Sequence, residues 1–456
     1  MKKLPFLLSL SLLAGSAMAQ KSAKGWTNLF DGKTLNGWKK LSGTAEYKIE
    51  NGAITGITSQ GTPNTFLVTE KEYGDFILEL EVLMEDTTSN SGIQFRSHLN
   101  PEGNNGKGRV YGYQFEIDPS ARQWSGGIYD EARRDWLYPL DLNPAAKPAF
   151  KNGQFNKVRI ECIGHNLRTF VNNVEAAYVV DTFDASGFIA LQVHSIGKPE
   201  QAGKKIFWKN IRIKTTGLVS SPHLAGTYVV NTIPNNLSEA EKKSGYGLLF
   251  DGATSKGWKG AYKPAFPEKG WEVKDGAISV LASNGSESTN GGDIVTTKQY
   301  SAFDLSFQFK LTTGANSGVK YFVTLSENNP GSAIGLEYQV LDDKVHPDAK
   351  MGRDGNRTMS SLYDLITAKK SDRFVRPPGQ WNYARVIVYP NNHVEHYLNG
   401  IKVLEYERGS QAYKDLVAIS KYKKWPDFGQ AKQGYILIQD HGNDVSFRSI
   451  KIRELN

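Results

Sequence analysis

Cysteine is nearly absent from this chain of 456 residues, because Cys162 is the only one. A single cysteine excludes an intramolecular disulfide and any zinc site built on several cysteines. Clusters of like charge are also lacking: 55 Lys and Arg against 47 Asp and Glu leave a net charge of +8, scattered along the chain. Without a basic patch we expect no nucleic-acid partner.

Familiar catalytic signatures are missing as well. The chain contains no Gly-x-Ser-x-Gly, no Walker-type phosphate loop and no His-Glu-x-x-His. These absences argue against the hydrolases, nucleotide-binding proteins and metalloproteases that carry such motifs. Charged residues at 22% and aromatic residues at 11% are ordinary values for a globular protein, which argues against wholesale disorder.

No apolar run is long enough to cross a bilayer, so we expect no transmembrane segment. Residues 4–13 form a short apolar run that follows Lys2 and Lys3 and precedes Ala17-Met18-Ala19. This order is typical of a cleavable signal peptide covering residues 1–19. We therefore expect a mature chain that begins at Gln20 and works in the periplasm or outside the cell.

Short motifs recur in the same order in the two halves of the chain, which predicts two copies of one domain. We place the copies at residues 25–215 and 244–456, joined by a linker over residues 216–243. Within the linker, Ser238-Glu-Ala-Glu241 fits a capping box that starts one short helix. The matched motifs, first copy and then second, are 29–38 with 249–258, 47–54 with 271–278, 90–92 with 316–318, 153–156 with 379–382, and 191–194 with 438–441.

The remaining pattern predicts strands. Residues 76–82 and 303–309 alternate apolar and polar side chains, and long helical periodicity is missing. Asn51-Gly, Asp275-Gly and Asn399-Gly are hairpin-turn dipeptides between such runs. Many short strands with Gly-rich turns predict an all-β fold with a sandwich of two antiparallel sheets in each copy.

Candidate functional residues follow from strand geometry, because side chains at i and i+2 lie on one face of a strand. This spacing places Gln114, Glu116 and Asp118 together in the first copy, and Glu337 beside Gln339 in the second. The acid and the amide have exchanged positions between the copies. Such a face suits acid–base chemistry, although a solvated sheet face would carry the same residue types.

A Gln-x-His pair also recurs, as Gln192 with His194 and as Gln439 with His441. Its recurrence in otherwise divergent strands favours a functional role over a merely solvated strand. A cation accompanies the first copy at Arg96, where the second copy has a phenylalanine and offers Lys320 two residues earlier.

Two loops supply further candidates. Trp124 lies in a loop with Arg122 and is suited either to stacking on a sugar ring or to core packing. His346 follows Asp342 by four residues and is either a metal ligand or base, or a surface-loop histidine.

Taken together, the motifs resemble the bacterial family of 3-keto-disaccharide hydrolases, also described as 3-keto-glucoside-1,2-lyase/3-keto-2-hydroxyglucal hydratase domains. The resemblance covers nearly the whole predicted mature chain, twice. It implies a concanavalin A-like jelly roll that acts on a small carbohydrate already oxidised at C3. The motifs that carry it include Leu-Phe-Asp-Gly…Gly-Trp at both starts, Asn-Ser-Gly-Ile-Gln-Phe-Arg96, Glu337-Tyr-Gln339, Gly379-Gln-Trp-Asn382 and Ile438-Gln-Asp-His-Gly442.

That substrate gives the candidate residues a chemical purpose. A ketone at C3 acidifies the C2 proton, so a base can form an enolate that expels the C1 substituent. The reaction needs a base, a group that stabilises the oxyanion and an acid for the leaving oxygen. Our catalytic candidates are His194 or Glu116 as base, Arg96 at the oxyanion and Asp118 as acid in the first copy, and His441 or Glu337, Lys320 or a divalent ion, and Asp342 in the second.

We expect the substrate to contact further polar and aromatic side chains on the same faces. Whether a metal takes part is left open by the sequence, and the ligand candidates are Glu337, Asp342 and His346. The substrate-binding candidates are Gln114, Arg122, Trp124, Tyr129 and Gln192 in the first copy, and Gln339, Tyr363 and Gln439 in the second.

Other functions fit the same sequence. A non-catalytic tandem sugar-binding protein would use the same sandwiches and aromatic loops. A conventional glycosidase would use Glu116 and Asp118 on an unoxidised glycoside. Differences between the copies indicate either that one performs elimination and the other hydration of the 2-hydroxy-3-keto-glucal, or that one domain is active and the other binds.

Overall fold

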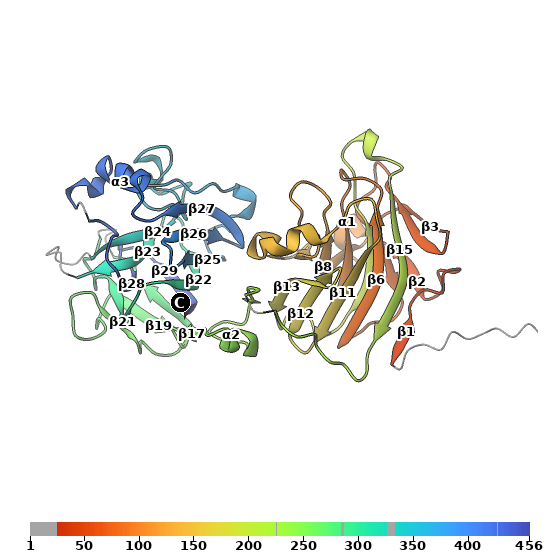
Figure 1. The fold of residues 1–456 in the computed structure, drawn as a ribbon, viewed down its shortest axis with the longest axis horizontal. Helices are drawn as coiled ribbons and strands as arrows, with labels where there is room; N and C mark the ends of the chain where they lie inside the picture. The colour runs from red at the N-terminus through yellow and green to blue at the C-terminus, as the bar shows by residue number, and fades with distance from the viewer. Residues whose placement is uncertain (1–24, 225, 284–286, 326–332, 426) are drawn as a thin grey trace, which may run out of the picture.

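Two β-sandwiches lie side by side in the computed structural model, one for each copy of the repeat (Figure 1). The structure describes residues 25–456 except 225, 284–286, 326–332 and 426. The predicted signal peptide and the expected new N-terminus at Gln20 lie outside the described residues. The prediction of an all-β fold with two β-sandwich domains in tandem is confirmed.

The first sandwich consists of a nine-stranded and a seven-stranded sheet. The nine-stranded sheet runs β16 (Val230–Asn231), β13 (Val174–Val180), β12 (Asn166–Val171), β11 (Asn156–Ile163), β6 (Phe76–Met84), β15 (Lys205–Lys214), β4 (Ala53–Ile57) and β3 (Glu46–Glu50), with β1 (Trp26–Asn28) beside β15. The seven-stranded sheet runs β10 (Asp135–Tyr138), β9 (Ile128–Glu131), β8 (Arg109–Ile117), β7 (Ser91–Asn100), β14 (Phe188–Val193), β5 (Thr65–Thr69) and β2 (Trp38–Leu41).

The second sandwich repeats this plan with an eight-stranded and a five-stranded sheet. The eight-stranded sheet runs β19 (Trp271–Lys274), β20 (Ala277–Val280), β29 (Val445–Glu454), β22 (Phe303–Leu311), β25 (Trp381–Val388), β26 (His393–Leu398) and β27 (Ile401–Glu407), with β17 (Gly247–Leu248) beside β29. The five-stranded sheet runs β18 (Trp258–Gly260), β21 (Ile294–Tyr300), β28 (Gly434–Ile438), β23 (Asn316–Thr324) and β24 (Ile334–Leu341).

Alternation along the strands explains where the core lies. On β6, Phe76, Leu78, Leu80 and Val82 all belong to the core between the two sheets of the first sandwich. Cys162 on β11 is buried in the same core, as a small apolar residue would be. Because the period of a strand is two residues, the intervening polar side chains point away from this core.

The three predicted hairpin dipeptides have the backbone that their composition favours. Asn51, Asp275 and Asn399 have φ values of 51°, 51° and 50°, and the glycine after each also has a positive φ. The predicted helix is present as α2 (Glu239–Lys243), and Ser238 and Glu241 form the expected capping box.

The longer helix α3 (Gln411–Ala418) was not predicted, because it buries only a short apolar stripe that includes Tyr413 and Val417. The other helical segments are α1 (Gly103–Gly106), η1 (Leu140–Leu142), η2 (Pro144–Ala149), η3 (Pro199–Gln201), η4 (Pro347–Lys350), η5 (Asp372–Phe374) and η6 (Lys421–Lys424).

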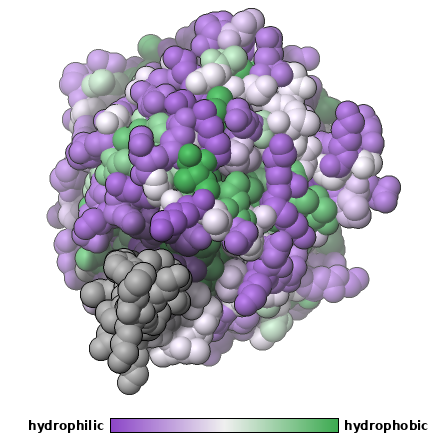
Figure 2. Space-filling view, turned by 90° about the vertical axis from the view of Figure 1, so that its right-hand side faces the viewer, coloured by the Kyte–Doolittle hydropathy of each residue, from purple (hydrophilic) through white to green (hydrophobic). Residues whose placement is uncertain are grey.

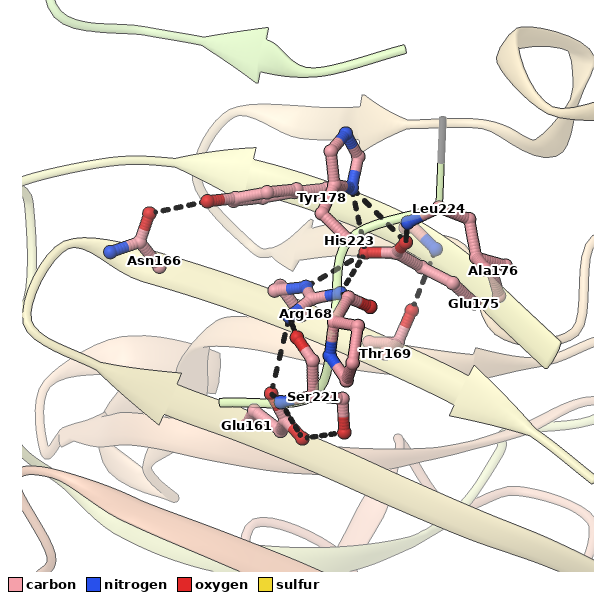
Figure 3. Close-up of polar contacts among 12 residues, drawn as sticks. Glu161, Asn166, Arg168, Thr169, Glu175, Ala176, Tyr178, Ser221, His223 and Leu224 are labelled. Atoms are coloured by element: carbon pink, nitrogen blue, oxygen red, sulfur yellow. Dashed lines mark hydrogen bonds and ion pairs between the residues drawn. The ribbon is translucent and has the colours of Figure 1, made fainter. Parts of the chain in front are cut away.

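The start of the linker is tied to the first sandwich by a buried charge cluster (Figure 3). Arg168 lies between Glu161 and Glu175, and its guanidinium also donates to the carbonyl oxygens of Ser221 and Pro222. The hydroxyl of Ser221 donates to Glu161 at 2.6 Å. A buried ion pair with all its hydrogen bonds made fixes geometry more than it adds stability, so the cluster gives the linker a defined path.

The two sandwiches share an apolar junction. Ile387 and Tyr397, on strands of the second sandwich, belong to the core cluster of the first. Gly400 lies so close to the first sandwich that a Cβ there would be 2.7 Å from Cγ of Pro139. Continuous packing of this kind predicts a fixed rather than a free arrangement of the two units.

The surface over the first sandwich is mainly hydrophilic, with a limited apolar area near the middle of that view (Figure 2). Apolar side chains are thus concentrated in the cores and at the junction. None of the helices in the described part of the chain is long and apolar enough to cross a membrane.

Candidate active sites

The first candidate site lies on the face of the seven-stranded sheet that points away from the main core. Glu116 on β8 pairs with Gly92 on β7, and Gly92 pairs with Gln192 on β14. Directly paired residues share a face, so these positions form one row across the sheet. Glu116 is only 4% exposed and Gln192 is fully buried, so this polar row is shielded from bulk water.

A chain of side-chain amides leads to Glu116. Gln94 Nε2 donates to Gln114 Oε1 at 2.6 Å, and Gln114 Nε2 donates to Glu116 Oε2 at 2.9 Å. Asn90 Nδ2 donates to the other carboxylate oxygen at 2.7 Å. Gly92 makes room for this arrangement, because a Cβ there would lie 2.3 Å from Cδ of Gln114.

Burial raises the pKa of Glu116 to about 7, although the hydrogen bonds from Asn90 and Gln114 lower it. Arg122 faces the same carboxylate with Nη2 4.0 Å from Glu116 Oε1, while its Nε donates to Asp118 Oδ2 at 2.7 Å. A carboxyl that titrates near neutral pH can take a proton in one step and return it in another. The structure therefore brings the predicted residues Gln114, Glu116, Asp118 and Arg122 together.

The Gln-x-His pair lies beside this group. Val193, the last residue of β14, is paired with Ser91, the first residue of β7. His194, just after β14, and Asn90, just before β7, therefore lie at the same end of the sheet. The Nδ1 of His194 lies 2.6 Å from the carbonyl oxygen of Ser195 and must donate to it, which leaves Nε2 unprotonated in the neutral ring. Burial lowers the pKa of His194, which favours that neutral, basic form.

Arg96 does not join the site. It adopts a positive φ of 46° at an irregularity of β7, and its guanidinium donates to the carbonyl oxygens of Gly74 and Gly164, each at 2.9 Å. It also pairs with Asp75 at 2.9 Å. Its hydrogen bonds thus hold neighbouring loops in place, and the expectation that it stabilises an enolate is corrected.

The aromatic candidates of the first domain pack against one another. Trp124 is only 3% exposed, packs edge-on against Trp136 at a centroid distance of 4.7 Å, and donates its indole N–H to Asp141. This burial favours the core-packing alternative over sugar stacking. Tyr129 is more accessible and reaches Asp135 with its hydroxyl at 2.7 Å. It is also paired with Gln114, so its side chain shares the polar face.

The second candidate site occupies the equivalent face of the five-stranded sheet. Gly318 pairs with Gln339, and Lys320 pairs with Glu337. Glu337 occupies the space that Gly318 leaves open, since a Cβ there would lie 2.3 Å from Oε1 of the glutamate. Register therefore matches Glu337 with Gln114 and Gln339 with Glu116, as the exchanged acid and amide in the sequence suggested.

Glu337 is 4% exposed, and its carboxylate accepts no hydrogen bond from the described residues. Burial raises its pKa to about 7, and the ammonium groups of Lys320 and Lys421 lower it. Lys421 comes from η6 and places Nζ 4.1 Å from the ring centroid of Tyr363. Desolvation lowers the pKa of Lys421, Glu337 opposes that change and Lys320 adds to it. The site thus pairs an ionisable acid with two cations.

Further carboxyls balance these cations. Lys320 Nζ lies 3.7 Å from Glu287, and Gln439 Nε2 donates to the same carboxylate at 2.8 Å. Burial raises the pKa of Asp293 to about 6, although Lys320 lowers it. Burial lowers the pKa of Lys320, but Glu337, Asp293 and Glu287 outweigh this and hold it above its usual value. Lys320 is therefore charged at neutral pH.

The proposed metal ligands are not gathered. Asp342 accepts hydrogen bonds from the backbone N–H groups of Gly314 and Lys344, and His346 Nδ1 accepts one from Asp348. Among the residues that the structure describes, Glu337, Asp342 and His346 do not bring their ligand atoms within 4.8 Å of one another. His346 instead lies edge-on to His441, 5.9 Å away, at the rim of the second site.

Several residues of the two sites were missed in the sequence. Asn90 belongs to the repeated Asn-Ser-Gly motif, so its recurrence was a usable signal. Glu287 comes from a loop and Lys421 from the short helix η6, both in segments without a counterpart in the first copy, and no spacing in the sequence connects them to Glu337. Tyr363 is nearly buried and donates to Asp348 at 2.8 Å, so its ring rather than its hydroxyl faces Lys421.

Known proteins resemble this chain in sequence and structure. The sequence model of one protein family, the 3-keto-alpha-glucoside-1,2-lyase-like domain, matches residues 25–214 and again residues 245–453. A 3-keto-disaccharide hydrolase from Bacteroides thetaiotaomicron is 37% identical over 233 residues, covering 46% of this chain and 79% of that protein. Two crystal structures from Parabacteroides distasonis, both provisionally described as glycosyl hydrolases, are 33% and 23% identical. The first match covers 49% of this chain and 100% of the other, with a TM-score of 0.43. The second covers 46% of this chain and 99% of the other, with a TM-score of 0.34.

Proposed function

Because the chain belongs to the family of 3-keto-alpha-glucoside-1,2-lyase-like domains, we propose that it cleaves 3-keto-glucosides or 3-keto-disaccharides by elimination. Membership makes it a carbohydrate-active enzyme. In the proposed reaction a base removes the C2 proton, and the bond from C1 to the glycosidic oxygen then breaks.

The observation that carries this proposal is the state of Glu337. An acid that is buried, free of hydrogen bonds from the described residues, and titrating near pH 7 is suited to take up a proton at neutral pH. The cations Lys320 and Lys421 act on the same carboxyl, and they are suited to bind an oxyanion formed next to it. A glutamate that served only packing would be expected to have its oxygens paired.

The electrons can be followed through the site. Glu337 takes the C2 proton, and the C2–H electron pair forms a C2=C3 enolate whose oxygen is stabilised by Lys320 or Lys421. When the C1–O bond breaks, the enolate electrons form the C1=C2 double bond and the C3 ketone returns. The leaving oxygen takes a proton from an acid at the site, for which the neutral glutamate just formed is suited. The products are the free aglycone and a 2-hydroxy-3-keto-glucal.

The first site is suited to the second half of a net hydrolysis. Adding water across C1=C2 requires a base for the water and an acid for C2. His194 presents an unprotonated Nε2 that is suited to act as the base. Glu116, with its pKa near 7, is protonated in a fraction of the molecules at neutral pH and is suited to act as the acid. We assign elimination to the second domain and hydration to the first.

The test incubates residues 20–456 in D₂O with a 3-keto-glucoside and, separately, with its unoxidised parent. Proton NMR follows aglycone release and the loss of the C2 proton signal. We expect release from the keto sugar alone, and a Glu337→Gln variant slowed at least about a hundredfold. A parallel series with EDTA determines whether a metal contributes.

Each alternative outcome has a distinct meaning. Release from the parent sugar at a similar rate would identify a conventional glycosidase. Saturable sugar binding without release would identify a binding protein. Accumulation of the glucal in a His194→Ala variant would support hydration in the first domain, whereas unchanged conversion to 3-keto-glucose would contradict it.

A further inference from the structure

The first site is in contact with the second domain through an aromatic side chain. Phe374, in η5 of the second domain, packs edge-on against Trp124 of the first, with ring centroids 6.2 Å apart. On the same indole, the guanidinium carbon of Arg122 lies 4.2 Å from the ring centroid. Arg122 in turn faces Asp118 and Glu116. A continuous line of contacts therefore runs from Phe374 to the acid–base carboxyl of the first site.

Phe374 is held in this position by a pair of asparagines. Asn399 Nδ2 donates to the carbonyl oxygen of Phe374 at 2.6 Å and to Oδ1 of Asn382 at 2.8 Å. Asn382 bonds the backbone of Arg376 at both N–H and C=O, at 3.0 and 3.1 Å. The guanidinium of Arg376 reaches the carbonyl oxygen of Arg134 in the first domain at 3.3 Å. The loop is thus fixed at both its own domain and the junction.

The first domain contains the same clamp with a different residue in it. Asn172 Nδ2 donates to Oδ1 of Asn156 at 2.8 Å and to the carbonyl oxygen of Ala149 at 2.9 Å. Asn156 bonds the backbone of Lys151 just as Asn382 bonds Arg376. Ala149 therefore occupies the place that Phe374 has in the second domain. The clamp is common to both copies, while the aromatic ring that it carries is specific to the one facing the other copy's site.

We propose that Phe374 is a positioning residue for the first active site: by packing on Trp124 it fixes Arg122 beside Glu116, so that this site is complete only when the second domain is docked. The inference rests on the catalytic role proposed for Glu116 and explains why two copies are joined in one chain. The substrate of the first site remains the 2-hydroxy-3-keto-glucal of the proposed hydration.

Arg122 depends on this support because its other anchor is small. Its side chain is 36% exposed, and its close polar contact is the single 2.7 Å hydrogen bond to Asp118. The rings of Trp124 and Trp136 supply the other contacts, with centroids 4.2 Å and 5.3 Å from the guanidinium carbon, and Phe374 restrains the nearer ring from the junction side. The charged groups that act on Glu116 are Asp118, which raises its pKa, and Arg122, which lowers it. If Arg122 is displaced, it opposes the effect of Asp118 less, and the pKa of Glu116 therefore rises.

The experiment compares Phe374→Ala with Phe374→Tyr in the full chain, using ¹³C-labelled glutamate and NMR to follow the titration of Glu116. The Glu116→Gln spectrum assigns the resonance. We expect Phe374→Ala, which copies the residue of the other clamp, to raise the apparent pKa of Glu116 by roughly half a unit. Phe374→Tyr keeps the ring and should leave the pKa unchanged.

Ile387→Ala is the matched control, because Ile387 packs in the same junction while the contacts to Trp124 are left in place. Both alanine variants should lower the melting temperature, but only Phe374→Ala should move the Glu116 titration. In hydration of the glucal, Phe374→Ala should lower kcat about tenfold with little change in KM. An unchanged titration in Phe374→Ala, or an equal shift in Ile387→Ala, would overturn the proposal. Because the titration needs no turnover, it remains decisive even if the enzymatic proposal fails.

Discussion

At the scale of single residues, the proposed chemistry depends on keeping an acid in a place where its charge is poorly solvated. Glu337 is almost completely buried, and its nearest compensation comes from two lysine ammonium groups rather than from hydrogen bonds. Burial disfavours the carboxylate, while the cations favour it, and the balance sets a pKa of about 7. Such a group exchanges stability for reactivity, because the ionised form is less favourable in the folded state than in the unfolded state.

This balance predicts how Glu337→Gln changes stability with pH. The folded-state pKa is raised above the unfolded value of 4.5, so the glutamate stabilises the fold least when pH exceeds about 7. Glutamine resembles the neutral acid and carries no such cost. We expect the variant to unfold at a temperature near wild type at pH 4.5 and to gain on the order of 2 kcal/mol at pH 8. Calorimetry at both pH values measures this; an equal effect at both would contradict it.

Lys421 allows a second test at this scale. Lys421→Met keeps much of the stem but removes the cation next to Glu337, so we expect kcat for elimination to fall by roughly a hundredfold. The pH at which activity is half-maximal should rise, because Lys421 lowers the pKa of Glu337. Lys423→Met, in the same short helix with an exposed side chain, is the control and should match wild type. Initial rates from pH 5 to 9 provide the measurement.

At the scale of secondary-structure elements, glycines on the central strands shape the polar face. Gly92 and Gly318 occupy equivalent positions, and each leaves the space filled by a catalytic-face side chain, Gln114 or Glu337. Neither has a positive φ, so their role is room for a neighbour rather than an unusual backbone.

Gly318→Ala tests this role. The new Cβ would lie 2.3 Å from Oε1 of Glu337, and the flexible end of the glutamate can move away at small cost in stability. We expect elimination to slow between tenfold and a hundredfold while the melting temperature changes by only a few degrees. Gly247→Ala, where a Cβ meets no atom within 4 Å, should leave both quantities unchanged. A large loss of stability in Gly318→Ala would instead indicate a backbone role.

The sequence contained the elements but not every contact between them. Strand alternation and the hairpin dipeptides at Asn51, Asp275 and Asn399 are local signals, so they predicted the sandwiches. Periodicity also placed Glu116 and Glu337 on polar faces. It failed at Arg96, because an irregularity in β7 gives this residue a positive φ and turns it to other loops. Lys421 reaches Glu337 through tertiary packing alone, which no spacing in the sequence encodes.

At the scale of the whole molecule, the two copies pack against each other, and their candidate sites differ. The first site surrounds its acid with amides and one arginine, and the second surrounds its acid with lysines and further acids. In the proposed reaction the two sites catalyse two successive steps, and a fixed junction would keep the second site near the product of the first. The value of the tandem arrangement therefore depends on how firmly the sandwiches are held together.

Tyr228 is the linker residue on which that coupling can be tested. Its ring lies 3.9 Å from the guanidinium carbon of Arg385, its hydroxyl is 2.9 Å from Ser306 Oγ, and its carbonyl oxygen accepts the hydroxyl of Tyr138. Tyr228→Ala removes the first two contacts to the second domain, together worth about 3 kcal/mol. We expect one cooperative calorimetric transition in wild type to split into two in the variant. Val219→Ser, in the same linker but 75% exposed, should keep a single transition. A wild-type protein that already unfolds in two steps would show that the junction does not couple the domains.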